Sequence, residues 1–441
     1  MTPEVTDMDA TGTNAAGTNA AGTKQHRHPL FRNRDFTLLW GGAAFTTLGA
    51  QVTILVYPLL VLWAGGSASA AGAVTGAALL PYLLVQLPAG AIADRYDRRR
   101  LMIISDLGCL VATSSVMLAV FLDRVWLPHL MAAAFVQGSL AIFYDLAERS
   151  AVKNLVPEEQ IPAALSQNEA RHRAMMMLGQ PLGGFLLSFV RWVPFLFTAL
   201  AHLTSLLMLL AIRKRFQGER ADKRETSLLA DVGEGVGWLW RQTFLRNVMI
   251  LVAVSNLVFE GMSLALMVVI RDSGGNPGTI GVVVAIGGVG GLVGALTAIW
   301  WRRRLSLPAL IVAGLVVWTL CVPPLAYVSN PILLGVVFAF CGYIGGVFNV
   351  AGGVYMVGLA PDHVLSRAIS VAMLIGAGAS FLGAFGGGFV LDTAGVGPAV
   401  LSMTILMGLL ALAAVLSPGV RAAARTREGG RLSAEDAARL D

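Results

Sequence analysis

Long apolar stretches alternate with short polar segments along most of the chain. Because a helix needs roughly 20 apolar residues to cross a hydrocarbon core about 30 Å thick, such a pattern predicts membrane-spanning helices. The apolar runs lie near 36–63, 70–92, 101–122, 127–147, 166–190 and 193–212, and again near 246–270, 278–300, 307–328, 331–358, 366–391 and 396–417. We therefore expect an all-α integral membrane protein whose twelve transmembrane helices form two pseudo-symmetric six-helix bundles.

The polar segments between these runs divide the chain into five parts. Residues 1–30 contain the near-repeat GTNAAGTNAAGT and few large apolar side chains, which is typical of a disordered segment. The stretch SLLADVGEGVGWLWRQ has apolar residues at helical spacing, so it predicts an amphipathic helix on the membrane surface. The expected parts are an N-terminal tail at 1–34, bundles at 35–212 and 246–417, a linker at 213–245 and a C-terminal tail at 418–441.

The basic residues predict an orientation for these spans. All of the 32 Lys and Arg residues except Arg124, Arg191 and Arg271 lie on one face: before or at the start of an odd-numbered span, after an even-numbered span, or in the C-terminal tail. By the positive-inside rule, both termini should face the cytoplasm from a multi-pass position in the cell membrane. The net charge of +6 then reflects topology, and we expect no nucleic-acid partner.

The composition supports a membrane protein and gives no support to catalysis. The chain is 56% hydrophobic and only 13% charged, with a mean hydropathy of +0.70. Its three cysteines lie inside apolar runs without disulfide-framework or metal-ligand spacing. The sequence contains no phosphate-binding GxxxxGK[ST] loop, no HExxH zinc motif and no GxSxG nucleophile elbow. We therefore expect no catalytic residue, metal or cofactor.

The stretch GAIADRYDRRR at 90–100 concentrates six charges directly after the second apolar run. The positive-inside rule accounts for its arginines but not for Asp94, an acid at the end of an apolar helix. An arginine or a helix N-terminus would hold such a carboxylate. The loop is therefore either a solvated turn or part of a cytoplasmic gate.

The six-plus-six order of spans, the long central loop and this charged stretch resemble the major facilitator superfamily. In that superfamily the loop between the second and third spans carries Gly-x-x-x-Asp-Arg-x-Gly-Arg-Arg. The matching residues here are Gly90, Asp94, Arg95, Arg98 and Arg99, with Asp97 where the family usually has Gly. The stretches LFRNRDFTLLWGGAAFTTLG at 30–49 and LVPEEQIPAALSQNEARHRAMMMLGQPLGG at 155–184 are similar to the drug-exporter branch that includes macrolide and siderophore exporters. The resemblance implies that Asp94 helps to hold the outward-facing state.

We expect a cytoplasmic gate network among the charged residues near the ends of the second, fourth and fifth spans. Its predicted members are Gly90, Asp94, Arg95, Arg98, Arg99, Asp145, Glu148, Arg149, Glu169 and Arg171. Arg149 or Arg171 is the expected partner of Asp94. The alternative is that Glu148–Arg149 and Glu169–Arg173 are interfacial ion pairs, which contribute little individually.

A glycine-rich motif in the fifth span also resembles superfamily exporters, which often carry Gly-Pro-x-x-Gly-Gly there. This chain reads Gly-Gln-Pro-Leu-Gly-Gly, with Gln180 at the usual Pro position. Small residues of this kind let helix backbones approach closely. The predicted helix-packing motif comprises Gly179, Pro181, Gly183 and Gly184.

Two acids inside the spans are the predicted proton-coupling residues. Glu260 lies about 14 residues into the seventh span, roughly 20 Å from its cytoplasmic end at 1.5 Å per residue, and no Lys or Arg lies within ten residues of it. Asp106 lies in the third span. Ionisable side chains inside a membrane are functional candidates by default. The alternatives are a hydrogen-bonded contact between helices or a position near the outer interface for Glu260, and a structural inner-gate network for Asp106. His202 in the sixth span reads mainly as a packing residue.

Polar and aromatic residues of the spans predict a central substrate cavity. Its expected members are Gln51, Tyr57, Tyr82, Gln86, Asn256, Asn349 and Tyr355. These features favour a monomeric secondary transporter that exports amphiphilic, drug- or antibiotic-like small molecules by proton antiport with alternating access. The open alternatives are an uptake symporter or a lipid or siderophore transporter of the same fold, and a non-transporting membrane receptor.

Overall fold

The computed structural model describes residues 30–213, 216, 236–237, 240–241, 243–359 and 362–417, apart from the side chains of 91, 94, 243–244, 354–359 and 362–369. The predicted N-terminal tail up to residue 29, most of the linker helix and the C-terminal tail from residue 418 lie outside this part of the chain. The described residues form helices and no strand, as the apolar pattern predicts.

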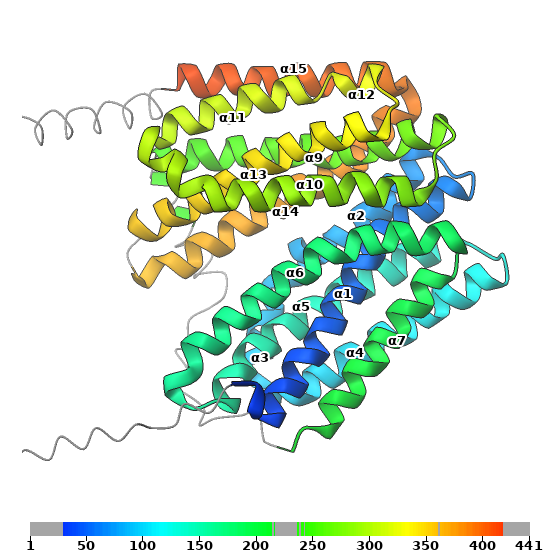
Figure 1. Cartoon of the computed structure of the whole chain (residues 1–441), viewed down its shortest axis with the longest axis vertical. Coiled ribbons are helices and arrows are strands. Elements are labelled where there is room, and N and C mark those ends of the chain that lie inside the picture. The colour runs from blue at the N-terminus through cyan, green and yellow to red at the C-terminus, as the bar shows by residue number, and fades with distance from the viewer. Residues whose placement is uncertain are drawn as a thin grey trace, which may run out of the picture.

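The N-terminal bundle contains the first six predicted spans (Figure 1). Its elements are η1 (Leu30–Arg32), α1 (Arg34–Trp63), α2 (Ala68–Leu84), α3 (Gln86–Arg95), α4 (Arg98–Phe121), α5 (Leu127–Leu155), η2 (Glu158–Gln160), α6 (Ile161–Phe189) and α7 (Val193–Ala211). The second span is broken into α2 and α3 at Val85. Pro88 explains the break, because it has no N–H to donate to the carbonyl of Leu84.

The C-terminal bundle contains the remaining spans. Its elements are α9 (Thr243–Asp272), α10 (Pro277–Arg304), α11 (Leu307–Cys321), α12 (Pro324–Tyr327), α13 (Pro331–Leu359), α14 (Asp362–Ala394) and α15 (Val396–Leu416). The ninth span is broken between α11 and α12, where Pro323 and Pro324 follow each other.

Ten helices of the described residues are long and apolar enough to cross a membrane. The two remaining predicted spans are the broken α2–α3 pair and α6, whose first half carries Glu169, Arg171 and Arg173. Length and composition are therefore consistent with twelve spans.

The two bundles repeat one packing arrangement. In the N-terminal bundle α1 packs on α6 and α7, α2 on α5, and α4 on α5 and α7. In the C-terminal bundle α9 packs on α14 and α15, α10 on α13, and α11 on α13 and α15. Each pair recurs six spans later, so the predicted pseudo-symmetric pair of helical bundles is confirmed, and the described helices are consistent with six spans in each.

Two helix pairs, α2–α14 and α6–α10, make the most extensive contacts between the bundles. Glycines permit both contacts. A Cβ atom on Gly184 of α6 would lie 2.8 Å from the carbonyl oxygen of Pro277 in α10, and one on Gly388 of α14 would lie 2.6 Å from that of Ala68 in α2. Since real Cβ atoms do not come so near, only glycine allows these backbones to approach as they do.

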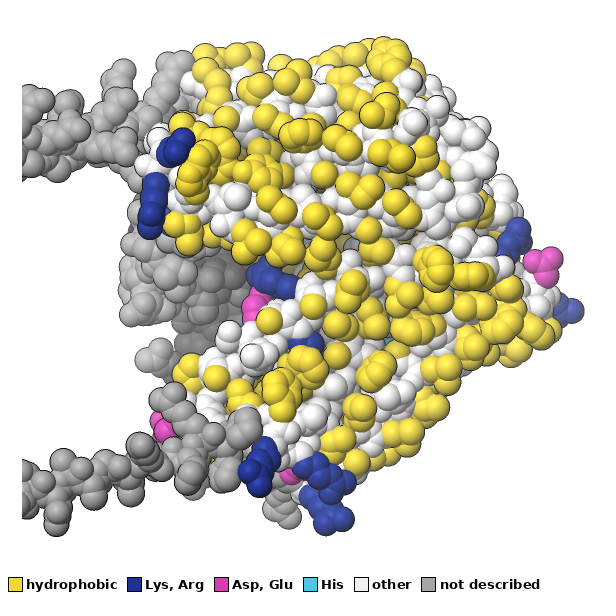
Figure 2. All heavy atoms as spheres, viewed as in Figure 1, with side chains coloured by type: hydrophobic (Ala, Val, Ile, Leu, Met, Phe, Trp, Pro, Cys, Tyr) yellow, Lys and Arg dark blue, Asp and Glu magenta, His cyan; other side chains and the backbone are white. Residues whose placement is uncertain are grey.

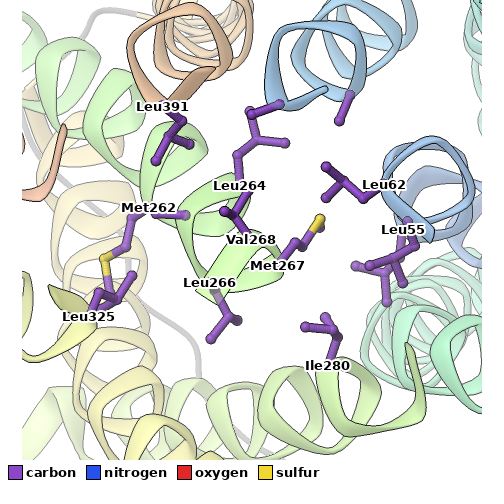
Figure 3. Packing of buried hydrophobic residues seen from close by; sticks show 14 of the residues in the cluster. Leu55, Leu62, Met262, Leu264, Leu266, Met267, Val268, Ile280, Leu325 and Leu391 are labelled. Atoms are coloured by element: carbon purple, nitrogen blue, oxygen red, sulfur yellow. The ribbon is translucent and has the colours of Figure 1, made fainter. Parts of the chain in front are cut away.

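The ends of the bundles differ in chemistry. The residues 98–100 at the start of α4 and 302–304 at the end of α10 are all arginine, and we call this end the basic end. Figure 2 shows most of the visible Lys and Arg side chains there. At the opposite end Leu62 of α1, Met267 of α9 and Ile280 of α10 converge (Figure 3). These three side chains, which we call the apolar seal, are 1%, 6% and 0% exposed, so the halves meet there without a gap.

Candidate functional site: a cavity between the two bundles

A cavity of about 1250 Å³ lies between the bundles. Toward the basic end its lining reaches Leu245 and Leu307, in the first turns of α9 and α11. In the opposite direction it extends to Tyr57 and Trp318, but the apolar seal does not line it. The cavity is therefore closed at the seal and extends toward the basic end, and its size suits a drug-sized molecule.

The described lining of this cavity includes five side chains that can be charged near neutral pH, and all five belong to the N-terminal bundle. They are Asp106, Asp145, Arg149, His172 and His202. Among the described residues, the C-terminal wall contains no Asp, Glu, Lys, Arg or His. One wall is polar and ionisable, whereas the described residues of the other are uncharged and largely apolar.

An aromatic cluster dominates the C-terminal wall. The ring of Trp318 packs edge-on against Phe259 and Phe348, with centroid separations of 4.7 and 5.0 Å. Its indole N–H donates to the carbonyl oxygen of Cys341 at 3.1 Å, so the ring is fixed and its polar atom is satisfied. Such a surface offers apolar area and ring edges to an aromatic ligand.

Six residues that the sequence assigned to the cavity lie on it. They are Gln51, Tyr57, Tyr82 and Gln86 of the N-terminal bundle and Asn256 and Asn349 of the C-terminal bundle. The side chain of Tyr355 lies outside the described residues. The aromatic cluster was missed by sequence reasoning, because its three residues come from three different spans and each looks like ordinary core.

Asp106 lies at the centre of a buried hydrogen-bond cluster on the N-terminal wall. Its Oδ1 accepts from Thr46 Oγ1 at 2.8 Å and faces His202 Nδ1 at 3.0 Å, and its Oδ2 accepts from Ser205 Oγ at 2.6 Å. Because the Ser205 proton is used in that bond, the hydroxyl of Tyr144 donates to Ser205 at 3.2 Å. Asp106 is fully buried, and three donors compensate the cost of burying its carboxylate.

Small residues of α1 bring this cluster together. A Cβ atom on Gly42 would lie 3.2 Å from Ser205 Oγ, and one on Gly49 would lie 3.1 Å from Thr198 Cγ2, so both glycines allow α7 to lie close to α1. Thr198 in turn donates to the Gly49 carbonyl at 3.3 Å.

Glu260, the other predicted proton-coupling acid, occupies a different environment. It is half-buried on α9, its hydrogen-bond partner is Ser380 of α14, and it does not line the cavity. Asn256, one turn earlier on α9, does line it. The structure therefore separates the two predicted acids, with Asp106 in the cavity wall and Glu260 beside α14.

Glu148 and Arg171 form a buried ion pair between α5 and α6. Arg171 Nη2 lies 3.1 and 3.0 Å from the two carboxylate oxygens, and Asn168 Nδ2 donates to Oε1 at 2.6 Å. Arg171 Nη1 also donates to the carbonyl oxygen of Trp40 in α1 at 3.1 Å. The alternative pairing of Glu148 with Arg149 is wrong, because Arg171 occupies the carboxylate.

Two arginines of the charged loop bind backbone carbonyls of neighbouring segments. Arg98 donates to the carbonyl oxygens of Ser150 and Phe216 at 3.2 and 3.4 Å, and Arg99 to those of Leu209 and Leu210 at 3.2 and 3.0 Å. The last carbonyls of a helix have no partner within it and favour a cation nearby. Arg99 therefore ties α4 to the C-terminal end of α7, and Arg98 links α4 to the last two turns of α5 and to Phe216 beyond α7, roles that sequence reasoning did not predict.

The other members of the predicted gate network are spread over the basic end. Arg95 is exposed, Gly90 has open space around it, and the side chain of Asp94 lies outside the described residues. The remaining members line a second cavity of about 530 Å³ or its edge: Asp145, Glu148, Arg149, Glu169 and Arg171.

Two further contacts of acidic side chains lie at the basic end. Glu169 forms an exposed ion pair with Arg173 at 2.7 Å, as the interfacial alternative expects. Asp97, which replaces the usual glycine of the loop, is the N-cap of α4, with Oδ1 accepting from the backbone N–H of Arg100 at 2.9 Å. Its φ of −63° suits any residue, so the replacement causes no strain and adds a cap.

The glycine-rich motif of α6 faces two helices. A Cβ atom on Gly183 would lie 2.7 Å from the carbonyl oxygen of Val52, and Gly179 packs against Gln51, so both face α1. Gly184 faces α10, where the carbonyl oxygen of Pro181 approaches Gly281. The motif thus lies where the N-terminal bundle meets its partner.

This arrangement of two repeated bundles around a polar and an apolar wall agrees with a family match. A profile described as "Transmembrane secretion effector" matches residues 27–429. The chain belongs to this family of major facilitator superfamily transporters. The family and the fold are those of transporters rather than enzymes.

Characterised relatives of this transporter include efflux pumps. It is 28% identical over 403 residues to the multidrug efflux pump Tap of Mycolicibacterium fortuitum, a match that covers 88% of this chain and 95% of that protein. It is 26% identical over 391 residues to Tap of Mycobacterium tuberculosis, with 85% and 91% covered.

Solved transporter structures share the fold. A bacterial homologue of the human lysosomal transporter Spinster, in an inward-facing and unoccupied conformation, matches with a TM-score of 0.66 at 15% identity and covers 90% of this chain and 98% of its own. A bacterial homologue of the iron transporter ferroportin, in an inward-facing state, matches with a TM-score of 0.67 at 16% identity, with 87% and 98% covered.

Proposed function

We propose that this transporter exports amphiphilic small molecules of the drug or antibiotic type from the cytoplasm by proton antiport with alternating access. The observation that carries the proposal is the cavity between the bundles, with its ionisable N-terminal wall and aromatic C-terminal wall. A polar or cationic group fits the first wall and a ring system the second. The similarity to multidrug efflux pumps supports the same class of substrate.

The distribution of charge supports the direction of transport. The positive-inside rule assigns the basic end, and with it both termini, to the cytoplasmic side of the cell membrane. A cavity that extends toward the basic end then receives substrate from the cytoplasm, while the apolar seal blocks the outer side. Export requires the seal to open and the basic end to close, with Asp94 as one part of the inner lock.

Asp106 and Glu260 are the proposed proton-coupling acids. We also propose that the transporter works as a monomer, and that protons and the small-molecule substrate are its only partners besides the lipid bilayer. Asp106 reaches the substrate cavity, whereas Glu260 lies where α9 meets α14. Protonation at either place can bias the movement of the two bundles if it changes their relative stability.

Everted membrane vesicles provide the test. With an acidic interior, vesicles that contain this transporter should accumulate the dye ethidium against its gradient, and a protonophore should abolish the accumulation. Faster uptake into right-side-out vesicles, driven by an inward proton gradient, would instead support an uptake symporter of the same fold. Binding without any flux in either vesicle type would contradict transport and support a receptor.

A further inference from the structure

His202 and Asp106 form the imidazole–carboxylate pair of the described residues. Their side chains are 2% and 0% exposed, and they belong to α7 and α4. Thr46 and Ser205 donate to the same carboxylate, so Asp106 is held as an acceptor on both oxygens. A carboxylate that only accepts requires the proton of the His202 bond to reside on Nδ1 of the ring.

The other ring nitrogen of His202, Nε2, is available to bind a proton. A neutral imidazole with its proton on Nδ1 carries a lone pair on Nε2. The described residues supply no hydrogen bond to Nε2, although they fix Nδ1 at 3.0 Å from Asp106. His202 also lines the central cavity, so a proton from water in the cavity has a direct path to the ring.

The surroundings allow the pair to change charge. The titratable groups that face it are the Cys109 thiol on its own helix α4 and the Tyr144 phenol on α5. Glu148 lies further along α5 and is already bound by Arg171. The facing side chains of α1 and α7 are the hydroxyls of Thr46 and Ser205. No Lys or Arg of the described residues bonds to the pair, so its net charge is −1 without the extra proton and zero with it.

We propose that, of the candidate proton-coupling groups, Nε2 of His202 rather than Asp106 or Glu260 is the atom that binds the coupled proton, and that Asp106 is a positioning residue that holds the ring and its tautomer. The assignment rests on the proposed antiport function. A hydronium ion in the cavity gives its proton to the Nε2 lone pair and leaves as water, and release reverses this step. The unprotonated pair presents a net negative charge to a cationic substrate, whereas the protonated pair presents none. Proton and substrate therefore weaken each other's binding reciprocally, as antiport requires.

The test compares gradient-driven transport with passive exchange in proteoliposomes that contain the full chain. Ethidium is the probe, and H202Q is the variant. H202Q should reduce the accumulation driven by a pH gradient at least tenfold more than it reduces exchange of ethidium across the membrane, because exchange needs no net proton movement. The matched control is H129Q, since His129 lies near the start of α5 at the sealed end and bonds to Ser115. H129Q should keep both activities.

A direct measurement of proton release from the wild-type protein gives a second readout that does not depend on whether the variant folds. Ethidium binding to the purified wild-type protein in weakly buffered detergent solution should release protons, and H202Q should release none. D106N should still bind ethidium but displace the pH profile of the release toward lower pH, because the imidazolium no longer has a carboxylate beside it.

The outcomes separate the two proposals. Gradient-driven accumulation that persists in H202Q, or wild-type binding without proton release, would overturn the assignment to His202. Absence of accumulation by the wild-type protein would overturn the antiport function and this assignment with it. An unchanged pH profile in D106N would reduce Asp106 to a structural residue and overturn its positioning role.

Discussion

The two bundles share one helix arrangement but present different surfaces to the cavity between them. The N-terminal bundle contributes the ionisable lining residues, including Asp106 and His202, while the described C-terminal lining is apolar around Trp318. The duplicated fold supplies the symmetry that rocking requires. The side chains that line the cavity then divide the work, with proton binding proposed for the N-terminal wall and apolar contact for the C-terminal wall.

The starts of the helices show the opposite relation. There both halves use side-chain N-caps, although the capping residues differ. Asp97 caps the third span and Ser306 caps the ninth, each accepting from a backbone N–H three residues later, at 2.9 and 3.3 Å. Ser67 and Asn276 cap the second and eighth spans in the same way, at 3.1 and 3.0 Å. Helix caps thus follow the repeat, whereas the cavity walls do not.

The largest expected effect comes from breaking the buried ion pair of the N-terminal bundle. R171M leaves the carboxylate of Glu148 buried without its cation, which should cost about 3–5 kcal/mol of stability. Thermal unfolding of the purified protein in detergent measures it. The matched control is R173M, whose ion pair with Glu169 is exposed, so its loss should be hardly measurable. Equal stability of the two variants would show that the buried pair is not a main support of this bundle.

On the opposite wall, W318L should weaken ethidium binding about tenfold, which corresponds to about 1.4 kcal/mol. Leucine keeps an apolar side chain but removes the ring that packs against Phe259 and Phe348. Equilibrium binding measures the loss, and the number of protons exchanged per ethidium should stay unchanged. W300L is the control, because Trp300 is half exposed on α10 and does not line the cavity. A changed proton number in W318L would contradict the division of work between the walls.

A smaller effect of about 1 kcal/mol should follow from removing either helix cap, in D97A or in S306A. Thermal unfolding should show similar losses for the two variants, because each removes one hydrogen bond to an N–H at the start of a helix. D97N retains an acceptor oxygen and should stay near the wild-type stability. A loss confined to one bundle would show that the repeated caps are not equivalent.

The fold could be predicted further than the site, for physical reasons. The bilayer imposes one length on every span, so the run at 36–63 corresponds to α1 at Arg34–Trp63, and the run at 127–147 lies within α5. The break at Val85 left a signal in Pro88, which the apolar pattern alone does not reveal.

The side-chain pairs between helices left no such signal in the sequence. Asp106 and His202 are separated by 96 positions, and only the packing of α4 against α7 brings them together. Sequence reasoning placed Glu148 and Arg171 in one network but not as partners, because their contact depends on the rotation of α5 and α6. The carbonyls that Arg99 binds are backbone atoms, which no residue pattern identifies.

The smallest expected effect concerns closure of the basic end, in which Asp94 is proposed to take part. Arg98 and Arg99 are bound to backbone carbonyls and Arg171 to Glu148, whereas Arg149 is exposed and makes no ion pair among the described residues. Arg149 is therefore our preferred partner for Asp94 when the basic end closes. An exposed pair contributes only about 0.2–1 kcal/mol, so D94N should shift the balance of states toward the open basic end by less than about fivefold.

Labelling of a cysteine introduced by V252C measures this shift, because Val252 lines the cavity on the C-terminal wall. In everted vesicles an impermeant maleimide should react with that cysteine faster when D94N is also present, and R149Q should have the same effect. If the two substitutions act on one pair, combining them should add nothing further. D123N is the matched control, because Asp123 lies between α4 and α5 at the sealed end, away from any closure at the basic end. Additive effects of D94N and R149Q would assign Asp94 a different partner, and an unchanged rate in D94N would make its loop a solvated turn whose described contacts only tie helices together.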